Sequence, residues 1–287
     1  MPAMILGQAA VPEDAVMALP FCAADPARQP AEPRRGARPR MTIRPAAPGD
    51  AREVVALIRE SFRPQDLALT IYGCAGIAAY LQMEFALPRS FSPSVYLLAV
   101  IEGGIAGFIE VRRGERGPHL NYIATRRACR GAGVGRALVD AALREADPPA
   151  GSQFTLDVFE HNQVAFDWYR RSGFRSLERR AFWRVPAQPA ASAAERDVRI
   201  PDLPQADAAH RVFGFSRFRL AHRGRAFMVG RLGARWFRLT EGDLLRCPGA
   251  LGVLSSLDAR REILFQGAGE TAGCFPLLWS IRMGRQL

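Results

Sequence analysis

The stretch that decides the fold is Leu120–Gly135, which reads LNYIATRRACRGAGVG. Its apolar first part predicts a strand over residues 120–125, and the pattern after the glycines predicts a helix over residues 133–146. Between them, R-x-x-G-x-G directs successive backbone N–H groups and a helix N-terminus toward one spot, and its glycines allow close approach. This is typical of a pyrophosphate cradle, although an arginine-rich and glycine-rich chain also produces the pattern by chance.

A second pattern follows about 30 residues later and consists of Asn162, Ala165, Tyr169 and Gly173-Phe174. Offsets of 3 and 7 place the first three on one face of a helix predicted over residues 163–172, and Gly173 stands where a helix-terminating glycine belongs. The chain holds two Asn and five Tyr, so the random expectation of this spacing is on the order of 10⁻⁵ to 10⁻⁴. This second pattern is therefore the specific one.

Together the two patterns resemble the GCN5-related N-acetyltransferase (GNAT) family over about residues 41–185. The order of elements predicted over this range, β-α-α-β-β-β-α-β-α-β, matches the family. The resemblance implies an α/β fold with a mixed, mostly antiparallel sheet flanked by helices. It also implies that the sheet is splayed open between the strands at 120–125 and 154–159, with acetyl-CoA as co-substrate in the gap.

The same resemblance assigns cofactor-binding residues one by one. Backbone groups of the 120–125 strand would pair with the pantetheine arm, the glycine-rich turn would hold the pyrophosphate, and the 163–172 helix would contact the arm. The cofactor-binding residues are Ile123, Ala124, Thr125, Arg130, Gly131, Ala132, Gly133, Val134, Gly135, Arg136, Asn162, Ala165 and Tyr169.

Tyr169 also resembles the family residue that protonates the departing thiolate. A phenol with a pKa near 10 can hydrogen-bond a developing thiolate, whose conjugate acid titrates near 8.5, and give up its proton as the C–S bond breaks. The alternative is that Tyr169 is a packing aromatic before the Gly-Phe turn. For the base that deprotonates the acceptor amine, the candidates are Glu110, His119 and Asn121. The alternatives are that Glu110 is a solvated strand end and that His119 lies in an exposed turn.

The acceptor would be a primary amine of a small molecule or peptide. The resemblance implies that the acceptor pocket is lined by residues 62–76, which include Tyr72 and Cys74, and by residues 175–183. An acyl-enzyme on Cys74 is an alternative to the direct transfer that the family favours. The sequence shows no metal-ligand spacing, so no metal is expected.

Composition bounds the remaining classes of function. The net charge is +11, but all 39 basic residues are Arg and are interspersed with acidic residues, which argues against nucleic-acid binding and is compatible with an anionic ligand such as coenzyme A. Five scattered cysteines indicate a reducing, cytoplasmic setting, and no apolar run is long enough for a membrane span. The other readings are a catalytically silent acyl-CoA-binding scaffold and an arginine-rich nucleic-acid binder.

Four segments are expected. Residues 1–40 are predicted to be a disordered extension, with Met41 as a candidate native start, and residues 41–185 to be the acetyltransferase domain. A linker at 186–196 leads to a small α+β accessory domain at 197–287. That domain is predicted to hold strands at 218–220, 227–229, 236–239 and 263–265 and a helix at 244–257. A degenerate GNAT-like half, a lid and a homodimerisation element remain alternatives for it.

Overall fold

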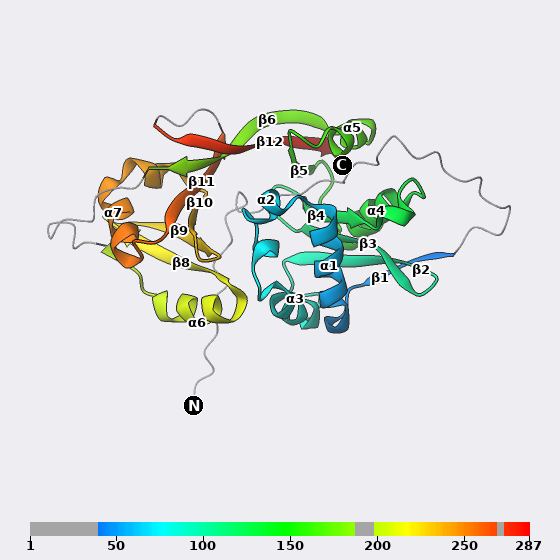
Figure 1. Ribbon diagram of the computed structural model, residues 1–287. Helices are drawn as coiled ribbons and strands as arrows, with labels where there is room; N and C mark the ends of the chain where they lie inside the picture. The colour runs from blue at the N-terminus through cyan, green and yellow to red at the C-terminus, as the bar shows by residue number, and fades with distance from the viewer. Residues whose placement is uncertain (1–39, 187–197, 269–272) are drawn as a thin grey trace.

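A computed structural model describes residues 40–186, 198–268 and 273–287 (Figure 1). Within these ranges twelve strands form one sheet in the order β1-β2-β3-β4-β5-β12-β6-β11-β10-β9-β8-β7. The strands are β1 (Met41–Pro45), β2 (Ser94–Ile101), β3 (Gly104–Arg112), β4 (His119–Thr125), β5 (Gln153–Phe159), β6 (Arg175–Val185), β7 (Val198–Arg199), β8 (Phe215–His222), β9 (Arg225–Leu232), β10 (Trp236–Leu239), β11 (Glu262–Ala268) and β12 (Phe275–Gln286). The helices are α1 (Ala51–Ser61), α2 (Pro64–Leu67), α3 (Ile77–Ala86), α4 (Val134–Ala146), α5 (Gln163–Arg171), α6 (Leu203–Phe213) and α7 (Pro248–Leu257), with 3₁₀ turns η1 (Pro48–Asp50), η2 (Ile71–Gly73), η3 (Arg127–Cys129) and η5 (Gly242–Arg246).

Helices cover both faces of the sheet in the first part of the chain. The buried stripe of α1, which includes Val54, Leu57 and Ile58, packs with α3 against one face. Val134 and Leu138 of α4 pack on the other face, where α5 also lies. Burying an aliphatic side chain of this size stabilises the fold by about 1.5–3 kcal/mol. The sequence pattern had predicted all four of these helices, and the fold class is confirmed.

The splay in the sheet lies where the resemblance places it. Strands β4 and β5 are parallel but pair only at His119–Thr155 and Leu120–Leu156. Beyond these two pairs the strands separate, so β4 and β5 leave a gap that widens toward their carboxyl ends. All other neighbours of β4 and β5 in the sheet are antiparallel.

Strand β12, near the end of the described chain, is the feature that the sequence analysis missed. It lies between β5 and β6 and is antiparallel to both, with Ser280 opposite Phe159 and Gly284 opposite Arg175. The accessory segment is therefore inserted between two neighbouring strands of the acetyltransferase sheet. The sequence does not show this placement, because the partner strands β5 and β6 lie far away in the chain. The polar residues Ser280 and Arg282 of β12 face the interior.

The division proposed at residues 186–196 therefore needs a correction for β12, since this strand belongs to the sheet of the first part. For the rest of the accessory segment the boundary stays a prediction. Helix α6 was also missed, because Ala206 is its only fully buried residue and it shows little apolar periodicity. The expected disorder of residues 1–40 falls almost entirely outside the described residues.

The accessory segment packs tightly against the first part, as Figure 1 shows for α6 and α3. A Cβ atom on Gly76, at the start of α3, would lie 2.2 Å from the carbonyl oxygen of Val212 and 2.5 Å from Cα of Phe213. Tyr80 of α3 stacks edge-on against Phe213 and Phe215, with ring centroids 5.6 and 5.0 Å apart. Only glycine permits such a close approach of two backbones. Within the described ranges, no helix is long and apolar enough to cross a membrane.

Candidate active site

The turn between β4 and α4 is an open cradle of backbone amides. Gly131 and Gly133 have φ angles of +79° and +81°, in the left-handed region that favours glycine, and a Cβ atom on either would meet nothing within 4 Å. The first hydrogen bond of α4 runs from Ala137 N–H to the Gly133 carbonyl. The amides of Val134 and Gly135 precede it and, like all first-turn amides, need partners outside the helix. This turn fits an anionic group such as a pyrophosphate.

The side chains around the cradle hold it in place. Arg130 is part-buried, and its Nε donates to the carbonyl oxygen of Thr125 at 3.4 Å, which ties the turn to the end of β4. Val134 packs into the core above Gly107 of β3, where a Cβ atom would lie 2.8 Å from Val134 Cγ1. Arg136 points to solvent, with 86% of its side chain exposed. The turn is thus anchored to β4 and β3 on one side, and its other side is open.

The second motif forms α5 with the orientation that its spacing predicts. The Asn162 Oδ1 atom accepts from the Ala165 N–H at 3.0 Å and caps the helix, and Ala165 is completely buried. Asn162 is therefore a helix cap, and its amide nitrogen and the second lone pair of Oδ1 are left for other contacts. Gly173, with a φ angle of +89°, ends the helical segment as predicted.

Tyr169 is a buried aromatic in the core on the α4 and α5 side of the sheet. Its ring packs on Phe174 with centroids 5.6 Å apart, and the side chain is 1% exposed. Its hydroxyl group has no hydrogen-bond partner among the described residues, although a buried hydroxyl usually has one. Burial raises the pKa of Tyr169 far above its ordinary value, so the hydroxyl stays protonated. A protonated hydroxyl without a partner can donate a hydrogen bond to a ligand.

Glu110 is buried, so the interpretation as a solvated strand end is wrong. A β-bulge in the β3–β4 pairing lies next to it, and Asn121 Nδ2 donates to Glu110 Oε1 at 2.6 Å. Arg112 Nε lies 3.7 Å from the same oxygen. Burial raises the pKa of Glu110, and the charge of Arg112 and the hydrogen bond from Asn121 act in the opposite direction. A carboxylate whose pKa is raised is a better general base near neutral pH, because its pKa lies closer to that pH.

His119 lies at the closed end of the gap. Its Nδ1 is 2.9 Å from Oγ1 of Thr155, the residue that it faces across the β4–β5 pairing. The side chain is part-buried, so the exposed turn considered for it is also wrong.

Glu110 and Tyr169 belong to opposite faces of the sheet. Glu110 is paired across the strands with Tyr96 and Tyr122, which pack with the core under α1 and α3. Directly opposed residues in a sheet share a face. Tyr169 belongs to the core on the α4 and α5 side. The candidate base and the candidate acid thus flank the splay from its two sides.

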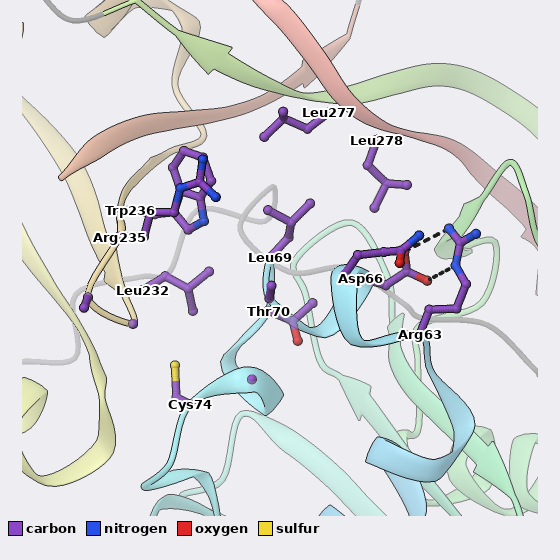
Figure 2. A pocket seen from close by; sticks show the side chains of 15 residues that line it. Arg63, Asp66, Leu69, Thr70, Cys74, Leu232, Arg235, Trp236, Leu277 and Leu278 are labelled. Carbon is purple, nitrogen blue, oxygen red and sulfur yellow. Dashed lines mark hydrogen bonds and ion pairs between the residues drawn. The ribbon is translucent and has the colours of Figure 1, made fainter.

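A cavity of about 520 Å³ opens on the α1 side of the sheet (Figure 2). Three segments surround it: the loop at residues 63–74, the accessory turn at residues 232–236, and Leu277 and Leu278 of β12. Residues 62–76 were predicted to line an acceptor pocket and do line this cavity, whereas none of residues 175–183 does. We call it the large cavity.

The loop that lines the large cavity is held by a polar cluster. Asp66 is buried and accepts from Arg63 at 3.1 Å, and His161 Nε2 lies 3.1 Å from its Oδ2 atom. Because His161 follows β5, this cluster ties the loop to the start of α5. Cys74 faces the cavity (Figure 2), but burial raises the pKa of its thiol, which disfavours the thiolate that an acyl-enzyme would need.

Comparison with known proteins agrees with this architecture. Residues 60–174 match the family model described as "Acetyltransferase (GNAT) family". The GCN5-related N-acetyltransferase of Sphaerobacter thermophilus aligns with a TM-score of 0.55 at 14% identity, covering 86% of this chain and 95% of that protein. A protein of Pyrococcus horikoshii assigned as an acetyltransferase aligns with a TM-score of 0.52 at 14% identity, covering 91% and 94%. No curated protein matches the chain significantly.

The fold and its open cradle thus define an acyltransferase of the acyl-CoA-dependent type. More particularly, residues 60–174 form a GNAT-family acetyltransferase domain. The two solved structures share the fold over more than four-fifths of the chain, so the accessory segment is part of the common architecture.

Proposed function

We propose that this protein transfers an acetyl group from acetyl-CoA to a primary amine of a small molecule or peptide by direct attack. The observation that carries the proposal is the buried, unpaired hydroxyl of Tyr169 beside a splayed sheet whose cradle faces open space. A scaffold that only binds the cofactor has no need of a buried donor without a partner.

The cofactor supplies the acetyl thioester when it is bound. The amides of residues 131–136, with Arg130 beside them, hold the pyrophosphate, and the backbone of residues 123–125 orients the pantetheine arm. Asn162 and Ala165 shape the other wall of the gap. These assignments follow the resemblance, and the open cradle supports them.

Proton movement is divided between the two faces of the sheet. Glu110 accepts a proton from the acceptor ammonium, and Asn121 holds the carboxylate in place through its 2.6 Å hydrogen bond. Tyr169 then donates its proton on the other face. We favour Glu110 over His119 as base because burial raises the pKa of the Glu110 carboxylate, whereas His119 lies at the closed end of the gap. Direct transfer is favoured over an acyl-enzyme because burial raises the pKa of Cys74.

The other functional assignments are part of the same proposal. The protein acts in the cytoplasm, needs no metal, and binds neither nucleic acid nor membrane. A homodimer formed through the accessory segment stays a hypothesis, and a monomer that persists at high concentration in size-exclusion chromatography would contradict it.

Calorimetric titration of acetyl-CoA tests the cradle directly. The Gly133→Glu variant places a carboxylate where the pyrophosphate would bind, so we expect binding to fall below detection while the wild type binds. Gly103→Glu is the matched control, because Gly103 also has a φ angle of +81° with no atom within 4 Å of its Cβ position, yet it lies in the β2–β3 turn. Equal binding in all three proteins would contradict the proposed cradle.

Turnover separates the enzyme from the silent scaffold. A panel of primary amines with saturating acetyl-CoA should release CoA with at least one acceptor. Tight cofactor binding without turnover on a broad panel would favour the scaffold instead.

A further inference from the structure

A second, smaller cavity of about 70 Å³ lies between the accessory strands and the first part of the chain. Its wall is formed on one side by Tyr80 of α3 and Arg112 at the end of β3, and on the other by β8, β9 and β10. Of its twelve lining residues, four are arginines and none is acidic. We call it the arginine cavity, after Arg112, Arg217, Arg231 and Arg238.

Two of these arginines have acidic partners and two do not. Arg231 pairs with Asp207 at 2.6 Å, and Arg112 lies 3.7 Å from Glu110. Neither Arg217 nor Arg238 forms an ion pair with any residue that the structure describes. The four arginines that line the cavity therefore outnumber the ion pairs that they form, although Glu84 acts on Arg217 and Asp157 acts on Arg238 from outside the lining.

Arg238 shows most clearly that a partner is missing. It lies on the face of β10 that turns toward the first part of the chain, and its Nη2 donates to Gln266 Oε1 at 2.5 Å. Its Nε atom and the Gln266 Nε2 atom are both buried without a hydrogen-bond partner among the described residues. Burial lowers the pKa of Arg238 to about 10; Arg217 and Arg112 add to this shift, while Tyr122 and Asp157 act in the opposite direction. A guanidinium whose buried Nε has no hydrogen-bond partner is unfavourable unless a ligand supplies one.

The backbone leaves room beside Arg238 for that ligand. Gly230 stands directly opposite it on β9, and a Cβ atom there would lie 3.3 Å from Cβ of Arg238. Phe215 and Thr240 line the cavity on the same side as Arg238, and Tyr80 lines it on the other side. The cavity has the size of a small anionic group rather than of a whole substrate.

Contacts connect the arginine cavity to the candidate active site. Arg112 joins its wall to Glu110, which Asn121 of β4 holds. Leu232 lines both the arginine cavity and the large cavity. Arg112 thus belongs to the lining of the arginine cavity and lies 3.7 Å from the candidate base.

We propose that the acceptor amine carries an anionic group, a carboxylate or a phosphate, and that Arg238 and Arg217 bind this group in the arginine cavity. The inference rests on the proposed function, because it names the class of acceptor for that reaction. Guanidinium groups bind both kinds of anion in bidentate geometry. The same positive charge favours the neutral form of the acceptor's amine, since like charges disfavour the ammonium.

The test compares matched acceptors with the full chain and saturating acetyl-CoA. The carboxylate pair is 4-aminobutyrate and 4-aminobutanamide, and the phosphate pair is 2-aminoethyl phosphate and ethanolamine. We expect the anionic member of at least one pair to have a kcat/KM about 10- to 100-fold higher than its neutral partner. Arg238→Met and Arg217→Gln should bring this ratio toward one. Arg225→Gln is the matched control, because Arg225 is an exposed arginine of the same segment that pairs with Asp243.

Equal or better use of the neutral members would overturn the proposal, as would a preference that survives in both arginine variants. If neither member of either pair is acetylated, a binding measurement tests the proposal instead. Succinate and inorganic phosphate are then titrated by calorimetry with CoA saturating, so that the cradle is already filled. Binding that Arg238→Met or Arg217→Gln weakens about 10-fold or more would support the anion site even where the acyl transfer itself has failed. The absence of binding, or equal binding in all variants, would overturn it.

Discussion

The gap between β4 and β5 and the cavities between the two parts of the chain are built in different ways. The gap is made by one continuous stretch from β4 to α5, and its cradle acts through backbone amides that two glycines leave exposed. The cavities are made by side chains from the α1–α3 loop, β3, β8–β10 and β12. A site of the first kind leaves a local pattern in the sequence, and a site of the second kind leaves none.

The comparison predicts that the two regions fail differently when they are altered. Changes in the gap should remove catalysis from a protein that stays folded. Changes between the parts should either loosen the structure or alter the choice of acceptor.

The largest effect is expected at Tyr169. Tyr169→Phe keeps the ring that packs on Phe174 and removes only the unpaired hydroxyl, so kcat should fall about 10²- to 10⁴-fold with acetyl-CoA binding and thermal stability close to those of the wild type. Tyr96→Phe, which removes a hydroxyl that donates to Glu84 at 3.1 Å, serves as a control for the loss of a phenol. Unchanged turnover in Tyr169→Phe would leave Tyr169 as a packing residue only.

The next effect concerns Glu110 and depends on pH. Because burial raises its pKa, the wild-type kcat/KM should rise with pH as Glu110 ionises, and Glu110→Gln should lose this limb together with about 10²-fold in rate. Stability should change in the opposite sense. A carboxyl whose pKa is raised by folding contributes stability below its unfolded pKa and loses it as the pH rises through its folded pKa. The Tm of Glu110→Gln relative to wild type should therefore increase from pH 4 to pH 8.

A structural effect of about 3–5 kcal/mol is expected where β12 joins the sheet. Arg282 donates to both carboxylate oxygens of the fully buried Asp157, at 2.9 and 2.8 Å. Arg282→Met would leave that carboxylate buried without its partner. Burial alone would raise the pKa of Asp157, but the hydrogen bonds and the charge of Arg282 lower it below its ordinary value. The stability that this pair contributes is present above the unfolded pKa and lost as the pH falls through the folded pKa, so denaturant unfolding should show the full defect at pH 7 and a progressively smaller one as the pH falls below about 3.8.

The smallest effect is expected at the contact between α3 and the accessory segment. Gly76→Ala places a Cβ atom within 2.5 Å of the α6 backbone, so the two parts must separate slightly, at a cost of about 1–3 kcal/mol. Gly49→Ala, whose Cβ would meet nothing within 4 Å, should leave the free energy of unfolding nearly unchanged. If both variants unfold alike, the parts are not held by this contact.

Much of the first part of the chain could be read from the sequence because its determinants are local. The apolar stripe of α1, the glycines at 131 and 133, and the spacing from Asn162 to Tyr169 each act within one or two turns of a helix or at its end. The structure confirms these elements and the splay. The burial of Glu110 was not predictable, since it depends on Tyr96 and Tyr122 from neighbouring strands.

By itself the sequence determined the acetyltransferase fold and the position of the glycine-rich turn, since backbone conformation is set by nearby residues. Only the tertiary structure decided that β12 completes the sheet between β5 and β6 and that four arginines line one cavity. The reason for β12 is that its partner strands lie far away in the chain, although Trp279, Ile281 and Met283 alternate with polar or small residues as a strand should. Likewise, arginines on separate strands come to line one cavity only when chain closure brings these strands together.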